Sequence, residues 1–463
     1  MKIVENIPYD ALILGQEAAL HRICTEDDFY VHATASGNHN PLHLIDRDGD
    51  GDGRNEAIAP ALWVGSLVSA VLGNLLPGAG TLYESQSFRF LARAHAGDEL
   101  VARVRVAEKM GDRRVRFETM VDRPADGVRI LEGDAVVIAP AEKLTFEELE
   151  VPGLTVRRHR HFEALLAEAE PLDPIPTAVV APEDANALGG ALLAMRHTII
   201  APILVGNPTG IDAAAREIGA DLSGVEIVEA LDHDTAAHRA VDLVAEGRAA
   251  AVMKGHLHTD QLLRACLRRE QGLRAGRRLT HVFVMDVPGL SHPLLVTDAA
   301  INISPDLMTK VDIVQNAIDL ARSIGIAEPK VGVLSAVETV NTQIPSSVDA
   351  ALLAKMADRG QIRGGVVDGP LAMDNAIDLQ AARSKGIRSA VAGLAEVLVV
   401  PGIDAGNMLA KQLTYIAHAE AAGVVMGALV PIILSSRADD DMARLASCAV
   451  AALHAARGGG TSG

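Results

Sequence analysis

Residues 294–326, LLVTDAAINISPDLMTKVDIVQNAIDLARSIGI, contain the unit that decides the fold of most of this chain. A short apolar run, LLVT, ends in a polar loop, and the residues from Met308 onward place apolar side chains at helical spacing. A buried strand followed directly by a helix is one step of an α/β fold.

The same strand-then-helix step recurs from about residue 175 to the end of the chain, with strands expected in TAVVAPE, TIIAPILVG, AAVMKG, THVFVMDVPG, KVGVLSAVE and EVLVVPG. This alternation predicts a parallel or mostly parallel sheet covered by helices. Because one compact sheet rarely holds so many strands, we expect two α/β lobes, the second roughly over residues 275–425. The run 421–436, AAGVVMGALVPIILSS, is too short and too interrupted for a membrane span and is expected to be a buried strand.

Residues 1–145 have a different pattern. Pro60 to Leu76 form one apolar helical stretch, and alternating segments with turns at Gly97-Asp98 and Gly111-Asp112 follow it. One long helix with an antiparallel meander predicts an α+β unit. The charged, irregular stretch 146–176 is expected to be a linker, which leaves residues 177–463 as the α/β domain.

The composition limits the classes of function. The chain has 463 residues, 49% of them hydrophobic and 22% charged, which is typical of a soluble globular protein of about three structural units. A formal net charge of -18 argues against a nucleic-acid partner. Three widely spaced cysteines, no signal-like N-terminus and no apolar run of spanning length predict a cytoplasmic protein with no membrane partner. An acidic enzyme with anionic substrates must place Arg or Lys locally at its site.

Six polar or glycine-rich segments follow predicted strands: MKGHLHT (253–259), DAAIN (298–302), SAVE (335–338), VDGPLAMDNA (367–376), PGIDAGN (401–407) and SSR (435–437). Their order and spacing resemble the phosphate acetyl/butyryltransferases, and the resemblance extends from about residue 175 to the end of the chain. It implies a two-lobed phosphate acyltransferase fold that transfers an acyl group, from acetyl to butyryl, between coenzyme A and inorganic phosphate. It also implies a homo-oligomer, with acyl-CoA and phosphate as substrates and no cofactor.

The resemblance indicates where the transfer chemistry resides. Arg437 would hold two phosphate oxygens and stabilise charge as the bond forms, and Ser436 beside it would donate a hydrogen bond. The coenzyme A thiol, with a pKa near 8.5 if it resembles cysteine, is mostly protonated at neutral pH and needs a base. Asp439 is the first candidate and Asp441 the second, although acidic residues at a helix start also favour the helix dipole.

Other residues match the family at predicted strand ends. Lys254 is expected as a catalytic cation, with a strand-end salt bridge as the structural alternative. His256 and His258 have the spacing of a metal pair, but without a third ligand no metal site is predicted. The expected substrate-binding residues, some of which could instead only cap helices or form turns, are Thr259, Asp298, Asn302, Asp374, Gly406 and Asn407.

The segment SGNHNPLH (36–43), with the 60–76 helix and SQSFRFLARAHAGDEL, resembles the MaoC-like hotdog fold. Active relatives are (R)-specific enoyl-CoA hydratases whose loop reads Ser-Gly-Asp-x-Asn-Pro-x-His. His43 matches the histidine, but Asn38 stands at the aspartate position and cannot accept a proton from water. Because losing one of two acid/base groups typically costs about 10²–10⁴-fold, we expect hydratase activity to be lost or impaired unless His39 substitutes.

Two alternatives remain open for the whole chain. The alternatives to an acyltransferase with an impaired hydratase unit are a bifunctional hydratase and acyltransferase, and a non-catalytic acyl-CoA sensor that uses a transferase-like domain. The acidic run 46–53, DRDGDGDG, is expected to be a solvated loop, with a weak surface calcium site as the alternative, because no glutamate stands at the twelfth position of an EF-hand.

Overall fold

The computed structural model describes residues 3–44, 49–51, 53, 56–147, 156, 160–434 and 441–458. The chain divides into two units, Met1–Val156 and Arg157–Gly463. Helix α3 (Arg160–Ala169) lies in the stretch predicted as a linker, but Phe162 and Leu165 on it are buried in the largest core of the second unit. The second unit therefore begins before residue 177, because the apolar face of α3 has a core to cover.

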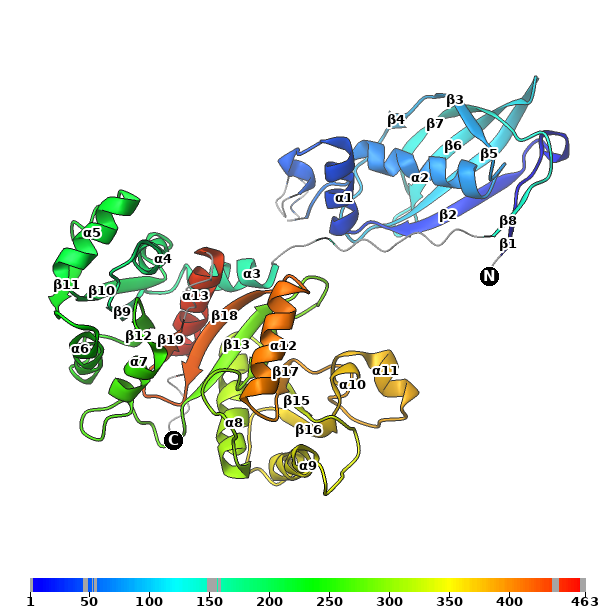
Figure 1. Ribbon diagram of the computed structural model, residues 1–463. Helices are drawn as coiled ribbons and strands as arrows, with labels where there is room; N and C mark the ends of the chain where they lie inside the picture. Colours follow the sequence, from blue (N-terminus) through cyan, green and yellow to red (C-terminus); the bar gives the residue numbers. More distant parts are fainter. Residues whose placement is uncertain are drawn as a thin grey trace. The chain divides into compact units, whose positions relative to one another are not determined.

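The first unit is an antiparallel sheet packed against one apolar helix, α2 (Ala61–Asn74) (Figure 1). Trp63, Val64, Leu67, Val68, Val71 and Leu72 of α2 are buried in the core of this unit. Along β5 the side chains alternate, so that Leu100, Ala102, Val104 and Val106 join the same core. The sheet order is β2 (Glu17–Ile23), β5 (Glu99–Gly111), β6 (Arg114–Arg123), β7 (Val128–Ile138), β3 (Leu82–Gln86), with β4 (Arg89–Phe90) paired to β7.

This arrangement is the helix wrapped by a curved antiparallel sheet that the hotdog resemblance implies. The predicted helix over residues 60–76 and the four alternating segments are confirmed as α2 and strands β3 to β7. The smaller elements are β1 (Ile3–Glu5) paired with β8 (Thr145–Glu147), α1 (Glu26–Ser36), and two 3-10 turns, η1 (Tyr9–Ala11) and η2 (Pro41–His43).

The second unit contains one continuous sheet of eleven strands. In spatial order these are β11 (Glu226–Glu229), β10 (Ile200–Gly206), β9 (Ile175–Val180), β12 (Ala251–Lys254), β19 (Ile432–Ile433), β18 (Glu420–Met426), β13 (Thr280–Asp286), β14 (Leu294–Thr297), β17 (Val397–Val399), β15 (Lys330–Leu334) and β16 (Val366–Leu371). Figure 1 shows helices on both sides of the sheet: α4 (Ala185–Arg196), α5 (Pro208–Ile218), α6 (His233–Ala245), α7 (Thr259–Cys266), α8 (Leu307–Ser323), α9 (Pro345–Asp358), α10 (Met373–Ile377), α11 (Leu379–Ser384), α12 (Ile403–Tyr415) and α13 (Asp441–Gly458).

The sheet is mixed. Strands β11 to β19 form one parallel array and β14 to β16 another, and between them the pairs β19–β18, β18–β13 and β13–β14 are antiparallel. Three reversals in succession make the two arrays run in opposite directions. The carboxyl ends of the strands in the two arrays therefore lie at opposite edges of the sheet. The α/β class is confirmed. Two lobes were expected because of the strand count, but the eleven strands form one sheet, since β13 and β18 pair and join the arrays.

The apolar cores show how far the two arrays are distinct. On one face a single core cluster contains Val179 and Leu204 of the first array together with Val331 and Val397 of the second. The other face carries two separate clusters, one around Val252 and one with Val296 and Leu398. The apolar core is thus continuous on one face of the sheet and divided into two clusters on the other.

The run 421–436 is not one strand as predicted. Residues Glu420–Met426 form β18, the chain reverses at Gly427, and Ile432–Ile433 return as the antiparallel partner β19. Gly427 has φ +88°, and a Cβ there would lie 2.2 Å from the carbonyl oxygen of Arg278. Glycine is required at this position, and its backbone freedom forms a turn that apolar periodicity does not reveal. None of the helices within the described ranges is both long and apolar enough to cross a membrane.

Candidate functional site

The segment predicted to carry phosphate binding joins β19 to α13. Ser436, Arg437 and Asp439 lie outside the described residues, so their predicted roles stay predictions. Asp441 is described at the first turn of α13, where its side chain is 80% exposed and 3.8 Å from Nη1 of the buried Arg444. Its carboxylate is accessible to solvent. A base that removes the proton of the coenzyme A thiol must be accessible in this way for the thiol to reach it.

Lys254 is a buried cation at the carboxyl end of β12, with only 7% of its surface exposed. Its Nζ donates to the carbonyl oxygen of Gly255 at 3.4 Å. Gly255 is held close to β9, since its N–H donates to the Val180 carbonyl at 2.8 Å and a Cβ would lie 2.3 Å from that same oxygen. The close approach needs glycine and holds Lys254 rigidly at the edge of the first array.

Thr259 begins α7, four residues after Gly255, and is partly exposed. His256 lies 3.8 Å from a carboxylate oxygen of Asp184, and the backbone N–H of His258 donates to Gln261 Oε1 at 3.2 Å. Within the part of the chain that the structure describes, no group of three histidine, cysteine or carboxylate side chains is arranged to hold a metal ion.

Asp298 and Asn302 form a closed loop at the carboxyl end of β14. The Asp298 carboxylate accepts hydrogen bonds from the backbone N–H groups of Ala300 and Ile301, both at 3.0 Å, and from Asn302 Nδ2 at 2.6 Å. Asn302 Nδ2 also donates to the Leu279 carbonyl at 3.0 Å. Both side chains therefore stabilise the loop itself, which is the capping alternative, and a contact with substrate stays a prediction.

Gly406 and Asn407 pack against this loop from α12. Gly406 lies inside the helix rather than at its entry, and a Cβ there would approach the Asp298 carbonyl oxygen and Val400 Cγ2 at 2.8 Å and Ala299 Cα at 2.9 Å. Asn407 Nδ2 donates to the Ala299 carbonyl at 3.4 Å. The structure thus brings Asp298, Asn302, Gly406 and Asn407 together as one loop-to-helix contact.

Replacing Gly406 with alanine should destabilise the second unit by about 1–3 kcal/mol, because the methyl group would force backbone atoms apart. Urea unfolding measures the change. Gly189→Ala in α4 is the matched control, because the only heavy atom within 4 Å of its added Cβ among the described residues is Ile218 Cδ1 at 3.9 Å. Substitution of a helix-interior glycine of that kind should raise the free energy of unfolding by about 0.5–1 kcal/mol. Equal destabilisation by both variants would contradict the packing role of Gly406.

Asp374 lies in a different cluster, at the start of α10. Lys385 Nζ is 3.0 Å from Asp374 and 3.5 Å from Glu338, and the hydrogen bond from Lys385 holds the pKa of Asp374 below its ordinary value.

The predicted site residues do not all lie at the same edge of the sheet. Lys254 at the carboxyl end of β12 and Asp298 at the carboxyl end of β14 lie at opposite edges, because the two arrays run in opposite directions. Strand-end position alone therefore does not assemble one site.

His281 on β13 was not predicted from the sequence. It is completely buried, its Nε2 lies 3.0 Å from the position a Cβ would take on Gly423, and its Nδ1 has no hydrogen-bond partner among the described residues. Burial lowers the pKa of His281 to about 4, against the opposing charge of Asp298. In the sequence, the signal for this residue is a single histidine within the apolar run THVFVMD. A buried ring nitrogen without a hydrogen-bond partner costs free energy, so such a histidine is a candidate functional residue.

The depressed pKa of His281 makes the stability of the second unit dependent on pH. In the unfolded chain histidine titrates near 6.5, so the unfolded state takes up the proton first and the native state loses stability as pH falls from about 6.5 to 4. His281→Gln should remove up to about 3 kcal/mol of this pH dependence, measured by urea unfolding at pH 7.5, 5.5 and 4.5. A His418→Gln variant, at an exposed position, should keep the wild-type slope. An unchanged slope in His281→Gln would contradict the assignment.

In the first unit the loop of the hydratase resemblance is ordered around His43. The Nδ1 of His43 lies 2.8 Å from the Ile58 carbonyl, so it is the protonated nitrogen and Nε2 carries the free electron pair. Asn38 is exposed and accepts a hydrogen bond from the backbone N–H of Asn40 at 3.3 Å. Of the two acid/base positions of the motif, the first presents the basic Nε2 of His43 and the second carries the amide of Asn38, which does not titrate.

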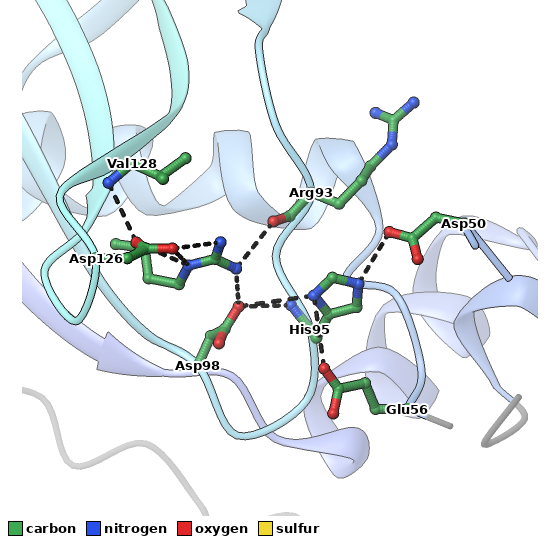
Figure 2. Close-up of polar contacts among 8 residues, drawn as sticks. Asp50, Glu56, Arg93, His95, Asp98, Asp126 and Val128 are labelled. Carbon is green, nitrogen blue, oxygen red and sulfur yellow. Dashed lines mark hydrogen bonds and ion pairs between the residues drawn. The ribbon is translucent and has the colours of Figure 1, made fainter. Parts of the chain in front are cut away.

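A buried histidine, His95, supports the strand that holds His43. Ile58 pairs with His95 through an isolated bridge, and His95 Nε2 lies 3.1 Å from Asp50 Oδ2 (Figure 2). The next carboxylate, Asp98, accepts from Arg123 Nη1 at 2.8 Å. Of the acidic run 46–53, positions 46–48 and 52 lie outside the described residues, and Asp50 binds His95. This network was not predicted, because its members come together only in three dimensions.

The charges in Figure 2 reinforce one another. The hydrogen bonds that Arg123 donates to Asp126 and Asp98 raise the pKa of Arg123, and Arg123 in turn lowers the pKa of Asp126. The three cysteines Cys24, Cys266 and Cys448 are buried free thiols, and burial raises the pKa of each to about 12. Thiols protonated to that degree are poor nucleophiles.

Comparison with known proteins adds four findings. Residues 231–452 match the family model described as phosphate acetyl/butaryl transferase. A phosphate acetyltransferase of Rhizobium meliloti is 56% identical over 296 residues, which cover 64% of this chain and 94% of that protein. A branched-chain phosphotransacylase from Enterococcus faecalis V583 has a similar structure, with a TM-score of 0.54 and 31% identity over 61% of this chain and 99% of that one. The R-hydratase PhaJ1 from Pseudomonas aeruginosa aligns with 34% of this chain and 100% of its own, at 36% identity and a TM-score of 0.32.

Proposed function

Because the chain belongs to the phosphate acetyl/butyryltransferase family, we propose that its second unit transfers an acyl group between coenzyme A and inorganic phosphate. Family membership carries this proposal, and the buried Lys254 supports it. Its ammonium group lies at the carboxyl end of β12, where the sequence predicts a substrate-binding segment. In this proposal the Lys254 ammonium stabilises the negative charge that develops on the acyl carbonyl or on phosphate.

In the proposed reaction a phosphate oxygen attacks the thioester carbonyl, the C–S bond breaks, and the leaving thiolate takes up a proton. Arg437 holds the phosphate oxygens and Ser436 donates to one of them. The carboxyl group of Asp439 or Asp441 supplies the proton to the thiolate in this direction, and removes it from the thiol in reverse. Arg, rather than Lys, suits the phosphate because its planar fork binds two oxygens at once.

We place the site over β13 and β18, on the face where the core is divided between the two arrays. Alternation along β13 puts Val282 and Val284 in the undivided core, so His281 and Phe283 lie toward the divided face. Leu434, which directly precedes the Ser436-Arg437 segment, also packs on that face. In this proposal the arrays act as two lobes although they share one sheet.

The test is phosphate-dependent release of coenzyme A thiol from acetyl-, propionyl- and butyryl-CoA. We expect release from at least one of the three, and the ranking of their kcat/KM values gives the chain-length preference. Release from none of them would overturn the transferase proposal and favour the sensor alternative. A homo-oligomer stays a prediction that light scattering tests directly.

For the first unit we propose binding of an acyl-CoA or enoyl-CoA with little hydration. The supporting observation is that the loop holds His43 through its hydrogen bond to the Ile58 carbonyl and carries an exposed Asn38 at the second position of the motif. The histidine can orient a water or a thioester, but no titratable partner stands at the second position of the motif. The bifunctional alternative requires His39 to accept a proton in place of the missing carboxylate.

A further inference from the structure

The second unit has a cavity of about 650 Å³ at the amino ends of β12 and β19. Ala250, which precedes β12, and Pro431, which precedes β19, are part of its lining. Lys254 and the segment after β19 are at the carboxyl ends of the same two strands. The cavity is therefore on the edge of the sheet opposite to the proposed transfer site.

Three arginines from three separate segments line this cavity. Arg277 precedes β13, Arg322 is in the last turn of α8, and Arg457 is in the last turn of α13. Two carboxylates oppose them, since Arg277 is 2.5 Å from Asp319 and Arg457 is 2.7 Å from Glu168. Among the described residues no carboxylate pairs with Arg322, whose side chain is exposed. One positive charge is left over in a chain of net charge -18.

Helix ends explain part of this arrangement. Arginines in the last turns of α8 and α13 favour the helix dipoles, and Arg457 Nη1 donates to the Ser323 carbonyl at 3.1 Å. An arginine can interact with the helix dipole from any side of the last turn, however, so this role does not explain why both arginines line the same cavity. It also does not apply to Arg277, which lies in a loop. All three residues nevertheless line one hollow, and each guanidinium group has five N–H donors of which only some are used.

Another part of the cavity lining is apolar. It comes from the end of β18 and the turn that leads to β19, and includes Met426, Ala428, Leu429 and Val430. Leu429 is 62% exposed, so a ligand that covers it would remove apolar surface from water. A hollow of this size, with both cationic groups and an apolar strip in its lining, suits a ligand with the same two parts.

We propose that this cavity binds a phosphorylated organic anion, whose phosphate lies on Arg277, Arg322 and Arg457 and whose organic part covers the 426–430 turn. Bidentate guanidinium contacts suit a phosphate, and the apolar strip favours a ligand larger than free phosphate. The turn continues into β19 and then into the segment of Ser436 and Arg437. Ligand binding here should therefore change the rate of acyl transfer from a distance, as an effector does.

Isothermal titration tests the binding step without any assay of activity. The probes are AMP, inorganic phosphate and adenosine, titrated into the full chain and into its Arg437→Ala variant. We expect AMP to bind more tightly than phosphate, adenosine to give no detectable heat, and the AMP affinity to be the same in both proteins. If the AMP signal disappears in Arg437→Ala, it belongs to the transfer site; that result, or no binding of AMP and phosphate at millimolar concentration, would overturn the proposal.

Charge variants separate a binding site from a structural ion pair. Arg322→Gln breaks no ion pair among the described residues and should weaken AMP binding about 10- to 100-fold with an unchanged Tm. Arg457→Gln and Glu168→Gln remove the same ion pair, but only the first removes positive charge. We expect Arg457→Gln to weaken AMP binding and Glu168→Gln to keep or strengthen it. Equal weakening by both, or full affinity in Arg322→Gln, would show that the arginines serve only the fold.

Discussion

The Arg437→Ala variant should lose about 10³-fold in kcat for phosphate-dependent thiol release, with the fold intact. The reason is electrostatic. In the proposed reaction the guanidinium group stabilises the phosphate charge as the new C–O bond forms, and a group of this kind contributes about 10²–10⁵-fold. Stopped-flow or steady-state detection of free thiol, with the KM for phosphate measured in the same series, gives the effect. A loss mainly in kcat places Arg437 on the transition state, whereas a loss only in KM places it in ground-state binding.

Two further variants make this result specific. Arg437→Lys keeps the charge but loses the two-oxygen contact, so we expect it to recover only part of the lost rate. Arg216→Ala, at an exposed position on α5, is the control for loss of one surface arginine and should retain wild-type turnover. Wild-type turnover in Arg437→Ala would remove this residue from the mechanism while leaving the transferase assignment to the thiol-release assay.

The second large effect is a gain. Asn38→Asp should raise crotonyl-CoA hydration by about 10²–10⁴-fold over the native protein, because it restores the second acid/base group beside His43. Hydration is followed by loss of enoyl absorbance. The backbone should accept the change easily, since Asn38 is exposed and its Oδ1 bond to the Asn40 N–H is one that a carboxylate oxygen also makes.

The double variant Asn38→Asp with His43→Asn is the matched control and should return hydration to the native level. If the native protein already hydrates crotonyl-CoA at a rate comparable to the Asn38→Asp variant, the view of this loop as impaired is wrong. In that case His39→Gln tells whether the neighbouring histidine has taken over as base.

The local elements were predictable because each depends on neighbours in the sequence. The helix over 60–76 has an apolar face wide enough to be recognised from periodicity, and the segment 294–326 shows a strand and a helix that the structure contains as β14 and α8. The turn at Gly427 was missed because its requirement is a tertiary contact with the Arg278 carbonyl. Helix α3 was assigned to the linker rather than to the second unit because the core that it covers is distant in sequence.

The sequence by itself determined the family, the two kinds of unit and the loss of a carboxylate at Asn38, because these depend on residue identity and order. Tertiary structure alone decided which residues come together. Three successive antiparallel pairings reverse the second array, so strand ends that look equivalent in sequence lie at opposite edges of one sheet. Three arginines separated by up to 180 positions meet in one cavity, and His281 becomes buried without a partner for one ring nitrogen. Such encounters are set by strand pairing and packing over long separations, which no local pattern encodes.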